Sequence, residues 1–512
     1  MKDCKVKKQI RLGAILSYVQ MAISIIIGIV YTPIMIRKLG QSEYGLYTTA
    51  ASMISMLTVL SLGFGSGYLK YYAKYKSKND NDSIFKLNGL FLLVFAIIGI
   101  VALIMGLFLT FNLKLVYSEG LTVDEYKIAK VLMLLLTINL TISFPMSVFN
   151  TIISANEKFI FQKLVEMGKT VLTPVLTLIM LFCGMKSIAV VITTLITAII
   201  VDCANVTYVF KNLKQKFVFR NFERGIFRGL FVYTSFILIN TIVKQVNWNV
   251  DKVLLGRFGG TLIVAVYAVG STLHNYYETF STSISNVFRT RVHLIVNTTL
   301  KDSEEQRNLL TDLFIRVGRL QFFVIGLIAT GLIFFGYDFI VKFWVGSGYE
   351  DSYYVCLLLV LPASISLIQN IGIDVQRALD RHKFRSIAYL IMSVINIILT
   401  VVLCQIYGAI GAAIGTAISV FLVDGLVMNI YYHKKCNLNI LTFWKKIARA
   451  AIGFVPPCIL GFFINKFIPT SNVGLLILKI VLYTIIYCCS LWLLSLEKNE
   501  KQYIKNIIFR KK

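Results

Sequence analysis

Polar residues interrupt an apolar stretch of the chain, "INTIVKQVNWNVDK", at residues 239–252. Asn240, Lys244 and Asn247 follow one another at i, i+4 and i+7, and Asp251 continues this row on one face of a helix. A polar row of this kind suits the wall of a water-filled cavity, because an ionisable residue inside a bilayer marks a functional position by default. The alternative for Lys244 is that its ammonium group reaches the lipid headgroups from the end of its helix.

Four more ionisable residues lie in apolar surroundings and allow two interpretations each. Glu166 and Lys169 are three residues apart, so they either pair with each other at the interface or form part of an anion-binding cavity. Asp202 and Asp424 lie deeper in their apolar runs. Each either exchanges a proton or binds a cation, or is a protonated carboxyl hydrogen-bonded to a neighbouring helix.

A third group of candidate residues lies around residue 275. His274 and Glu278 are at i and i+4, a spacing that allows a proton-responsive pair. Tyr276 and Tyr277 between them would suit stacking against a sugar, and core packing explains them equally well. Arg319, near the start of another apolar run, is expected to anchor its helix at the membrane interface.

The elements that carry these residues are membrane-spanning helices. Hydrophobic residues make up 57% of the 512 positions and charged residues 15%, against about 25% charged in soluble proteins. Apolar runs of roughly 20 residues, the length that crosses a bilayer, recur along the whole chain. The sequence predicts an all-α polytopic membrane protein with about fourteen spans, at residues 12–36, 44–69, 87–110, 128–154, 164–183, 187–209, 230–249, 261–285, 317–340, 353–376, 386–407, 409–431, 450–468 and 474–495.

The positive charge follows the predicted topology. Of the 52 Lys and Arg residues, 38 lie in one alternate set of loops and 10 in the other, so the net charge of +27 obeys the positive-inside rule. Both termini are therefore expected in the cytoplasm, and anionic lipid headgroups are the expected counter-charges. Nucleic acid is not an expected partner. The nine cysteines show neither a CxxC pair nor a zinc-ligand spacing, so no metal site is predicted.

Two halves of the chain are related. "RKLGQSEYGLYTTAAS" (37–52) and "RFGGTLIVAVYAVGST" (257–272) share Arg, Gly and Tyr at an offset of 220. Six spans per half give parallel repeats, a transporter architecture with the substrate site between the halves. The predicted organisation is an N-terminal lobe at residues 1–220, a C-terminal lobe at 221–440, and two further helices with a basic cytoplasmic tail at 441–512.

Enzymatic functions find little support in the sequence. "GKT" at 168–170 ends like a phosphate-binding loop, but the required upstream glycine is replaced by Lys163. The outer loops are too short for a catalytic domain of a glycan polymerase or glycosyltransferase. We therefore expect a transporter rather than an enzyme.

The sequence also resembles a known family. "RKLGQSEYGLY", "LSLGFGSGYLKYYAKY", "NWNVDKVLLGRFGGTLIVAVYAVGSTL" and "IYGAIGAAIGTAISVFLVDGLVMNIYY" are similar to segments of Wzx-type polysaccharide and O-antigen flippases. These belong to the multidrug/oligosaccharidyl-lipid/polysaccharide (MOP) exporter superfamily. The resemblance extends over nearly the whole chain and agrees with the span number, the repeat and the sidedness.

The resemblance implies a flippase of the bacterial cytoplasmic membrane. Its substrate would be an undecaprenyl-diphosphate-linked oligosaccharide, moved to the outer leaflet by alternating access for capsule, exopolysaccharide or O-antigen assembly. Lys244 and Lys169 are the candidates to neutralise the diphosphate. No cofactor is expected beyond a coupling proton or sodium ion, and a polysaccharide polymerase is a candidate partner. The alternatives are a cation-coupled drug or metabolite exporter of the same superfamily and a membrane glycan polymerase or glycosyltransferase.

Overall fold

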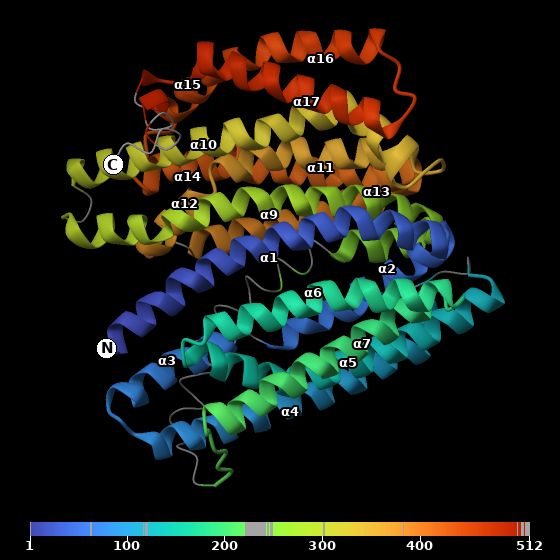
Figure 1. The fold of residues 1–512 in the computed structure, drawn as a ribbon, viewed down its shortest axis with the longest axis vertical. Helices are drawn as coiled ribbons and strands as arrows, with labels where there is room; N and C mark the ends of the chain where they lie inside the picture. Colours follow the sequence, from blue (N-terminus) through green and yellow to red (C-terminus); the bar gives the residue numbers. More distant parts are fainter. Residues whose placement is uncertain are drawn as a thin grey trace. The chain divides into compact units, whose positions relative to one another are not determined.

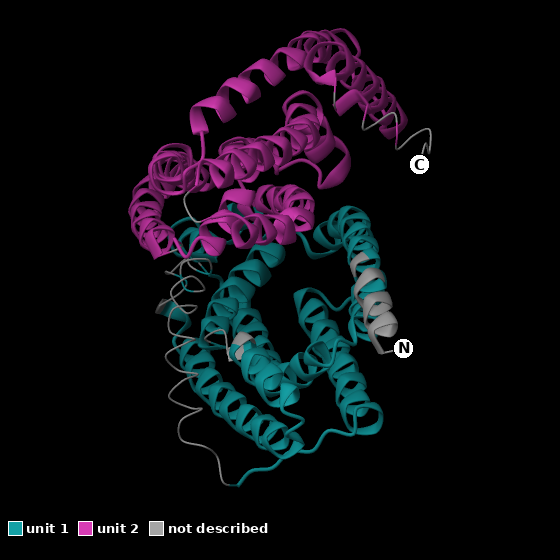
Figure 2. Ribbon diagram, turned by 90° about the vertical axis from the view of Figure 1, so that its left-hand side faces the viewer, with its two compact units in different colours: residues 1–265 teal, residues 266–512 magenta. Residues whose placement is uncertain are grey.

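The computed structural model describes residues 2–61, 64–115, 117, 121–220, 242, 245, 249–300, 303–381, 383–498, 500–502 and 506. The chain divides into two compact units, residues 1–265 and 266–512, and each is described by itself (Figure 2). This division follows spatial contacts, whereas the predicted lobes at 1–220 and 221–440 follow the sequence repeat and stay a prediction.

The first unit contains long helices that lie side by side (Figure 1). Its helices are α1 (Lys2–Leu39), α2 (Gln41–Met56), η1 (Leu57–Ser61), α3 (Phe64–Ser77), α4 (Asn81–Phe111), η2 (Leu113–Leu115), α5 (Val123–Ala155), α6 (Phe159–Phe182), α7 (Ser187–Thr207) and η3 (Tyr208–Asn212). Helix α5 packs against both α4 and α7, and α1 packs along α6.

The second unit has the same all-helical character. Its helices are α10 (Glu304–Tyr337), η4 (Asp338–Trp344), α11 (Glu350–Ile368), α12 (Ile371–Ala378), α13 (Lys383–Val420), η5 (Phe421–Val427), α14 (Met428–Lys435), α15 (Ile440–Ala451), η6 (Ile452–Phe454), α16 (Val455–Phe467), α17 (Val473–Ser490) and η7 (Leu491–Ser495). Helix α9 (Gly260–Thr298) begins in the first unit and continues into the second.

The fold is that of a multi-pass membrane protein, as predicted. Among the described residues, 10 helical stretches are long and apolar enough to cross a bilayer. One of them, Lys383–Lys435, covers two predicted spans. The predicted span at 230–249 lies almost entirely outside the described residues.

The stretch that covers two spans is folded back on itself within α13. Gly408 has φ 55° and ψ −129°, a conformation that breaks the helix and that side chains rarely adopt. The two arms then lie side by side. The amide of Asn396 on the first arm donates to the hydroxyl of Thr416 on the second, at 3.1 Å. The predicted break between residues 407 and 409 is therefore correct.

The two ends of the first unit have separate apolar cores. One core is rich in aromatic side chains, among them Tyr68, Phe91 and Phe149 from α3, α4 and α5. The other joins α2, α5 and α7 through Leu46, Leu132 and other aliphatic residues. Polar side chains between these cores are therefore held on rigid helices.

Candidate functional site

A group of polar side chains joins α1 and α6 in the first unit. The ammonium group of Lys163 lies 2.7 Å from a carboxylate oxygen of Glu166, one turn further along α6. It also donates to the side-chain oxygen of Gln20 on α1, at 3.2 Å. The side chains of Lys163 and Glu166 are 25% and 32% exposed, so the surrounding protein does not fully enclose either of them.

Further along α6, the polar side chains turn toward α7. Lys169 lies nearly two turns beyond Lys163 on α6, and it interacts electrostatically with Asp202 on α7. Both side chains are partly exposed. We call Gln20, Lys163, Glu166, Lys169 and Asp202 the α6 polar cluster. It contains two cations and two carboxylates on membrane-spanning helices, where isolated charges are costly.

Beyond Lys169 the polar side chains of α6 serve helix packing. The hydroxyl of Thr173 donates to that of Thr197 on α7 at 2.9 Å, and Thr177 and Thr193 meet at 2.6 Å. Hydroxyl pairs of this kind hold neighbouring helices together within a bilayer. The charged side chains of α6 are therefore confined to the α6 polar cluster.

The structure changes the partners expected for α6. Glu166 pairs with Lys163, which the sequence placed in a loop, because α6 begins at Phe159. Lys169 is attracted electrostatically by Asp202 on α7, without forming an ion pair with it. The signal that could have identified Lys163 is its three-residue spacing from Glu166, which puts the two on one helical face.

The polar row at 239–252 is described only in part. Asn240, Lys244 and Asn247 lie outside the described residues. Asp251 is described and is 2% exposed. The neighbouring amide of Gln245 donates to the hydroxyl of Thr58 in η1, at 2.8 Å.

The residues predicted around 275 lie on α9 in the second unit. His274 is 3% exposed, whereas Tyr276 and Glu278 are partly exposed. The hydroxyl of Tyr277 shares a 2.7 Å hydrogen bond with that of Ser364 on α11, and its ring is buried. Tyr277 thus packs between helices, and Tyr276 is the more accessible ring of the two.

Asp424 lies in a buried network in the second unit. Its carboxylate accepts a hydrogen bond from the hydroxyl of Tyr389 on α13, and it is 7% exposed. The guanidinium group of Arg385 donates to the hydroxyls of Tyr389 and Tyr432 and lies over the Tyr389 ring, 4.4 Å from its centroid. Arg385 also interacts electrostatically with Asp424. Arg385 was not among the predicted site residues, because it lies one residue before the predicted span at 386–407.

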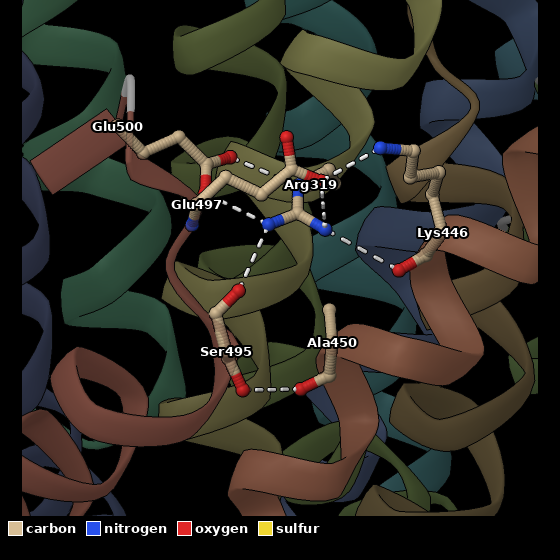
Figure 3. Close-up of polar contacts among 6 residues, drawn as sticks. All are labelled: Arg319, Lys446, Ala450, Ser495, Glu497 and Glu500. Carbon is tan, nitrogen blue, oxygen red and sulfur yellow. Dashed lines mark hydrogen bonds and ion pairs between the residues drawn. The ribbon is translucent and has the colours of Figure 1, made fainter.

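Arg319 is not an interface anchor, and that prediction was wrong. Its side chain is 3% exposed and forms two hydrogen bonds with Glu500, of 2.9 and 2.7 Å (Figure 3). It also donates to the carbonyl oxygens of Ser495, at 3.0 Å, and Lys446, at 3.4 Å. Glu497, whose carboxylate accepts from the Lys446 ammonium group, completes the group (Figure 3).

This Arg319 cluster joins α10 and α15 to the segment after η7. The hydrogen bond from Lys446 lowers the pKa of the Glu497 carboxyl below its ordinary value. Glu497 and Glu500 thus balance the charges of Arg319 and Lys446, and the Arg319 cluster has a structural role. Among the described residues, no group of three or more His, Cys, Asp or Glu side chains is arranged to hold a metal ion.

The membrane-spanning helices define the class of the protein, a multi-pass helical membrane protein. A family model described as "Polysaccharide biosynthesis protein" matches residues 11–288, more than half of the chain. The protein belongs to this family. A sequence search of curated proteins gives no match.

Solved structures with a similar fold are flippases and transporters of the MOP superfamily. One is the lipid II flippase MurJ in an inward closed conformation, with 18% identity, a TM-score of 0.69, and coverage of 94% of this chain and 97% of that one. Another is an inward-facing multidrug resistance MATE family transporter of the MOP superfamily, with 13% identity, a TM-score of 0.60, and coverage of 84% and 99%. A third is the MATE multidrug transporter DinF-BH, with 15% identity, a TM-score of 0.60, and coverage of 84% and 96%.

Proposed function

We propose that this protein is a flippase for undecaprenyl-diphosphate-linked oligosaccharide repeat units. It moves them from the cytoplasmic to the outer leaflet by alternating access, for the assembly of a surface polysaccharide. The observation that carries the proposal is the pair of lysines, Lys163 and Lys169, on one helix of a protein from a polysaccharide biosynthesis family. A diphosphate is an anion that such cations bind through charge-assisted hydrogen bonds.

The α6 polar cluster fits a ligand that comes and goes. Glu166 forms an ion pair with Lys163, and Asp202 attracts Lys169 from the neighbouring helix. When a diphosphate binds, it interacts with the two lysines in place of the carboxylates. The carboxylates then become available to bind a proton or a sodium ion. Asp202 is the better candidate for ion coupling, because Tyr389 and Arg385 already hold Asp424.

The setting of the proposed reaction follows from the sequence. The proposed location is a bacterial cytoplasmic membrane, as the family resemblance implies, and the distribution of Lys and Arg supports termini in the cytoplasm. The reaction is transport, so no bond is made or broken. A polysaccharide polymerase on the outer side is the partner that would use the product.

The decisive experiment is flipping of a fluorescent lipid-diphosphate-linked oligosaccharide by the purified protein in liposomes. Lys163→Gln and Lys169→Gln each remove one charge-assisted contact, worth about 1.5 kcal/mol or more, and should slow flipping at least tenfold. The matched control is Lys127→Gln, whose side chain is 74% exposed and should leave the rate unchanged. The absence of flipping by the wild type would contradict the proposal.

The same preparations separate the alternatives. Export of cationic dyes without glycan flipping would identify a drug or metabolite exporter. Formation of new glycosidic bonds from the lipid-linked sugar would identify a polymerase or glycosyltransferase.

A further inference from the structure

The turn between α1 and α2 contacts the first turns of several other helices. Gly40 has φ 78°, the left-handed region that favours glycine, and it lets α2 begin directly after α1. The next residue, Gln41, donates from its side-chain amide to the carbonyl oxygen of Leu262 on α9, at 3.4 Å. All of these residues belong to the first unit.

Glu125 is shared between its own helix and α2. One carboxylate oxygen accepts from the backbone and the hydroxyl of Thr122, at 2.9 and 3.0 Å, and thus caps α5. The other oxygen accepts a hydrogen bond from the hydroxyl of Ser42. The Ser42 hydroxyl also lies 3.1 Å from that of Thr261 on α9. One serine therefore connects the first turns of α2, α5 and α9.

The backbones of α2 and α9 approach each other without side chains between them. A Cβ atom on Gly45 would lie 1.8 Å from the carbonyl oxygen of Thr261. Just before α9, a Cβ atom on Gly256 would lie 2.8 Å from the side chain of Thr49 on α2. Surfaces of this kind, with hydroxyl contacts beside bare backbone, can part and meet again without any side chain having to repack.

A second carboxylate on the same turn makes a stronger attachment. Glu43 is 9% exposed, lies 3.0 Å from the ammonium group of Lys186, and accepts from the backbone of Ser187 at 3.1 Å. This contact fixes α2 to the start of α7. By contrast, α2 contacts α9 through single hydrogen bonds between neutral groups. Each changes the equilibrium between the closed and the open contact by roughly threefold to tenfold. The weaker side of the turn is therefore the one that faces α9.

We propose that Gln41, Ser42, Glu125, Thr261 and Leu262 form an outer latch, which opens and closes once in each transport cycle. Helix α9 continues from this contact into the second unit, so the latch ties the helix that links the two units to the first unit. Glu125 is its positioning residue, because it orients the Ser42 hydroxyl between α5 and α9. The latch proposal rests on the proposed function in one respect, the identity of the transported cargo.

The first test reads conformation and needs no cargo. Thr49 is fully buried behind the latch, and a Thr49→Cys variant reports its opening through labelling by a membrane-impermeant maleimide. Adding Ser42→Ala should raise the labelling rate roughly tenfold, because two contacts are lost. The matched control is Ser55→Ala, which removes a hydroxyl bonded within α2 itself, to Ser52. Equal labelling with and without Ser42→Ala would overturn the proposal.

The second test locks the latch. The Ser42→Cys/Thr261→Cys pair brings two thiols within reach of a disulfide, given the 3.1 Å between the native hydroxyls. Oxidation should reduce transport at least tenfold, and reduction should restore it. The control pair, Thr177→Cys/Thr193→Cys, links two helices that pack within the first unit and should transport normally when oxidised. Full transport by the oxidised latch pair would overturn the proposal.

The two proposals fail separately. If the wild type flips no lipid-linked glycan, but the locked pair blocks export of another cargo, the latch stands and the flippase does not. If the glycan is flipped at the wild-type rate by the locked pair, the flippase stands and the latch does not.

Discussion

Replacing Arg319 by methionine should detach the end of the chain from α10. The substitution keeps most of the side-chain volume and removes the guanidinium group that binds Glu500, Glu497 and two backbone carbonyl oxygens (Figure 3). Arg319 itself is 3% exposed, so the lost contacts are made away from bulk water.

The magnitude follows from the exposure of the partners. Removing one partner of a buried ion pair costs about 3–5 kcal/mol. Glu500 and Glu497 are 26% and 45% exposed, so water can reach both carboxylates once the arginine is gone. The cost therefore falls at the lower end, about 3 kcal/mol, which corresponds to roughly a hundredfold change in the local opening equilibrium.

Hydrogen exchange in lipid nanodiscs measures this opening directly. The amides of residues 490–497 should lose about two orders of magnitude of protection in Arg319→Met. Protection of α5, in the other unit, should not change. Lys445→Met, which removes an exposed cation from α15, is the matched control for the loss of charge.

A double-mutant cycle identifies the source of the effect. Glu500→Gln in the Arg319→Met background should add little, because its partner is already gone, and the coupling between the two residues should be about 1.5–3 kcal/mol. Wild-type protection in Arg319→Met, or additive effects in the cycle, would refute the assignment of a structural role to this cluster.

Other contacts give three further predictions. Gly45→Ala brings a Cβ atom within 1.8 Å of a backbone oxygen of α9 and should lower disulfide yield across the outer latch at least tenfold; Gly331→Ala, with no neighbour within 4 Å, should not. Asp202→Asn should flatten the dependence of flipping on the coupling-ion gradient, and Asp424→Asn should lower thermal stability and keep that dependence; the reverse pattern in liposomes would contradict the proposed ion site. The pKa of Glu497 is lowered from 4.5, so its contribution is present above that pH and lost as the pH falls through the lower folded value. Hydrogen exchange after η7 should therefore accelerate in acid below about pH 4.5 and stay constant from about pH 6 to 8, after correction for intrinsic exchange rates.

The helices of this protein could be predicted because the bilayer imposes their length. Each span requires roughly 20 apolar residues whatever its neighbours are, so hydropathy alone placed the break at Gly408. The predicted repeat pairs two turns whose glycines have similar backbone conformations. Gly40 and Gly260 have φ values of 78° and 80°, and a sequence offset of 220 relates these two turns.

The partners of the ionisable residues could not be predicted in this way. A charge near the end of a span can reach headgroups, water or another helix, and only the packing decides between them. Arg319 illustrates this point, since its partner Glu500 lies 181 residues later in the sequence. Arg385 and Lys163 were missed because both lie at span ends, where basic residues are common for topological reasons.

The separation between Arg319 and its carboxylates also has a consequence in time. At about 5–20 residues per second, synthesis of the 181 residues from 320 to 500 takes roughly 10–40 s. During this interval α10 is already made and its arginine has no counter-charge from Glu500. The ion cluster can therefore close only after α17 has been inserted and Glu497 and Glu500 have been synthesised. A chain truncated before Glu497 leaves the buried guanidinium group of Arg319 without these carboxylates, which is costly inside a protein.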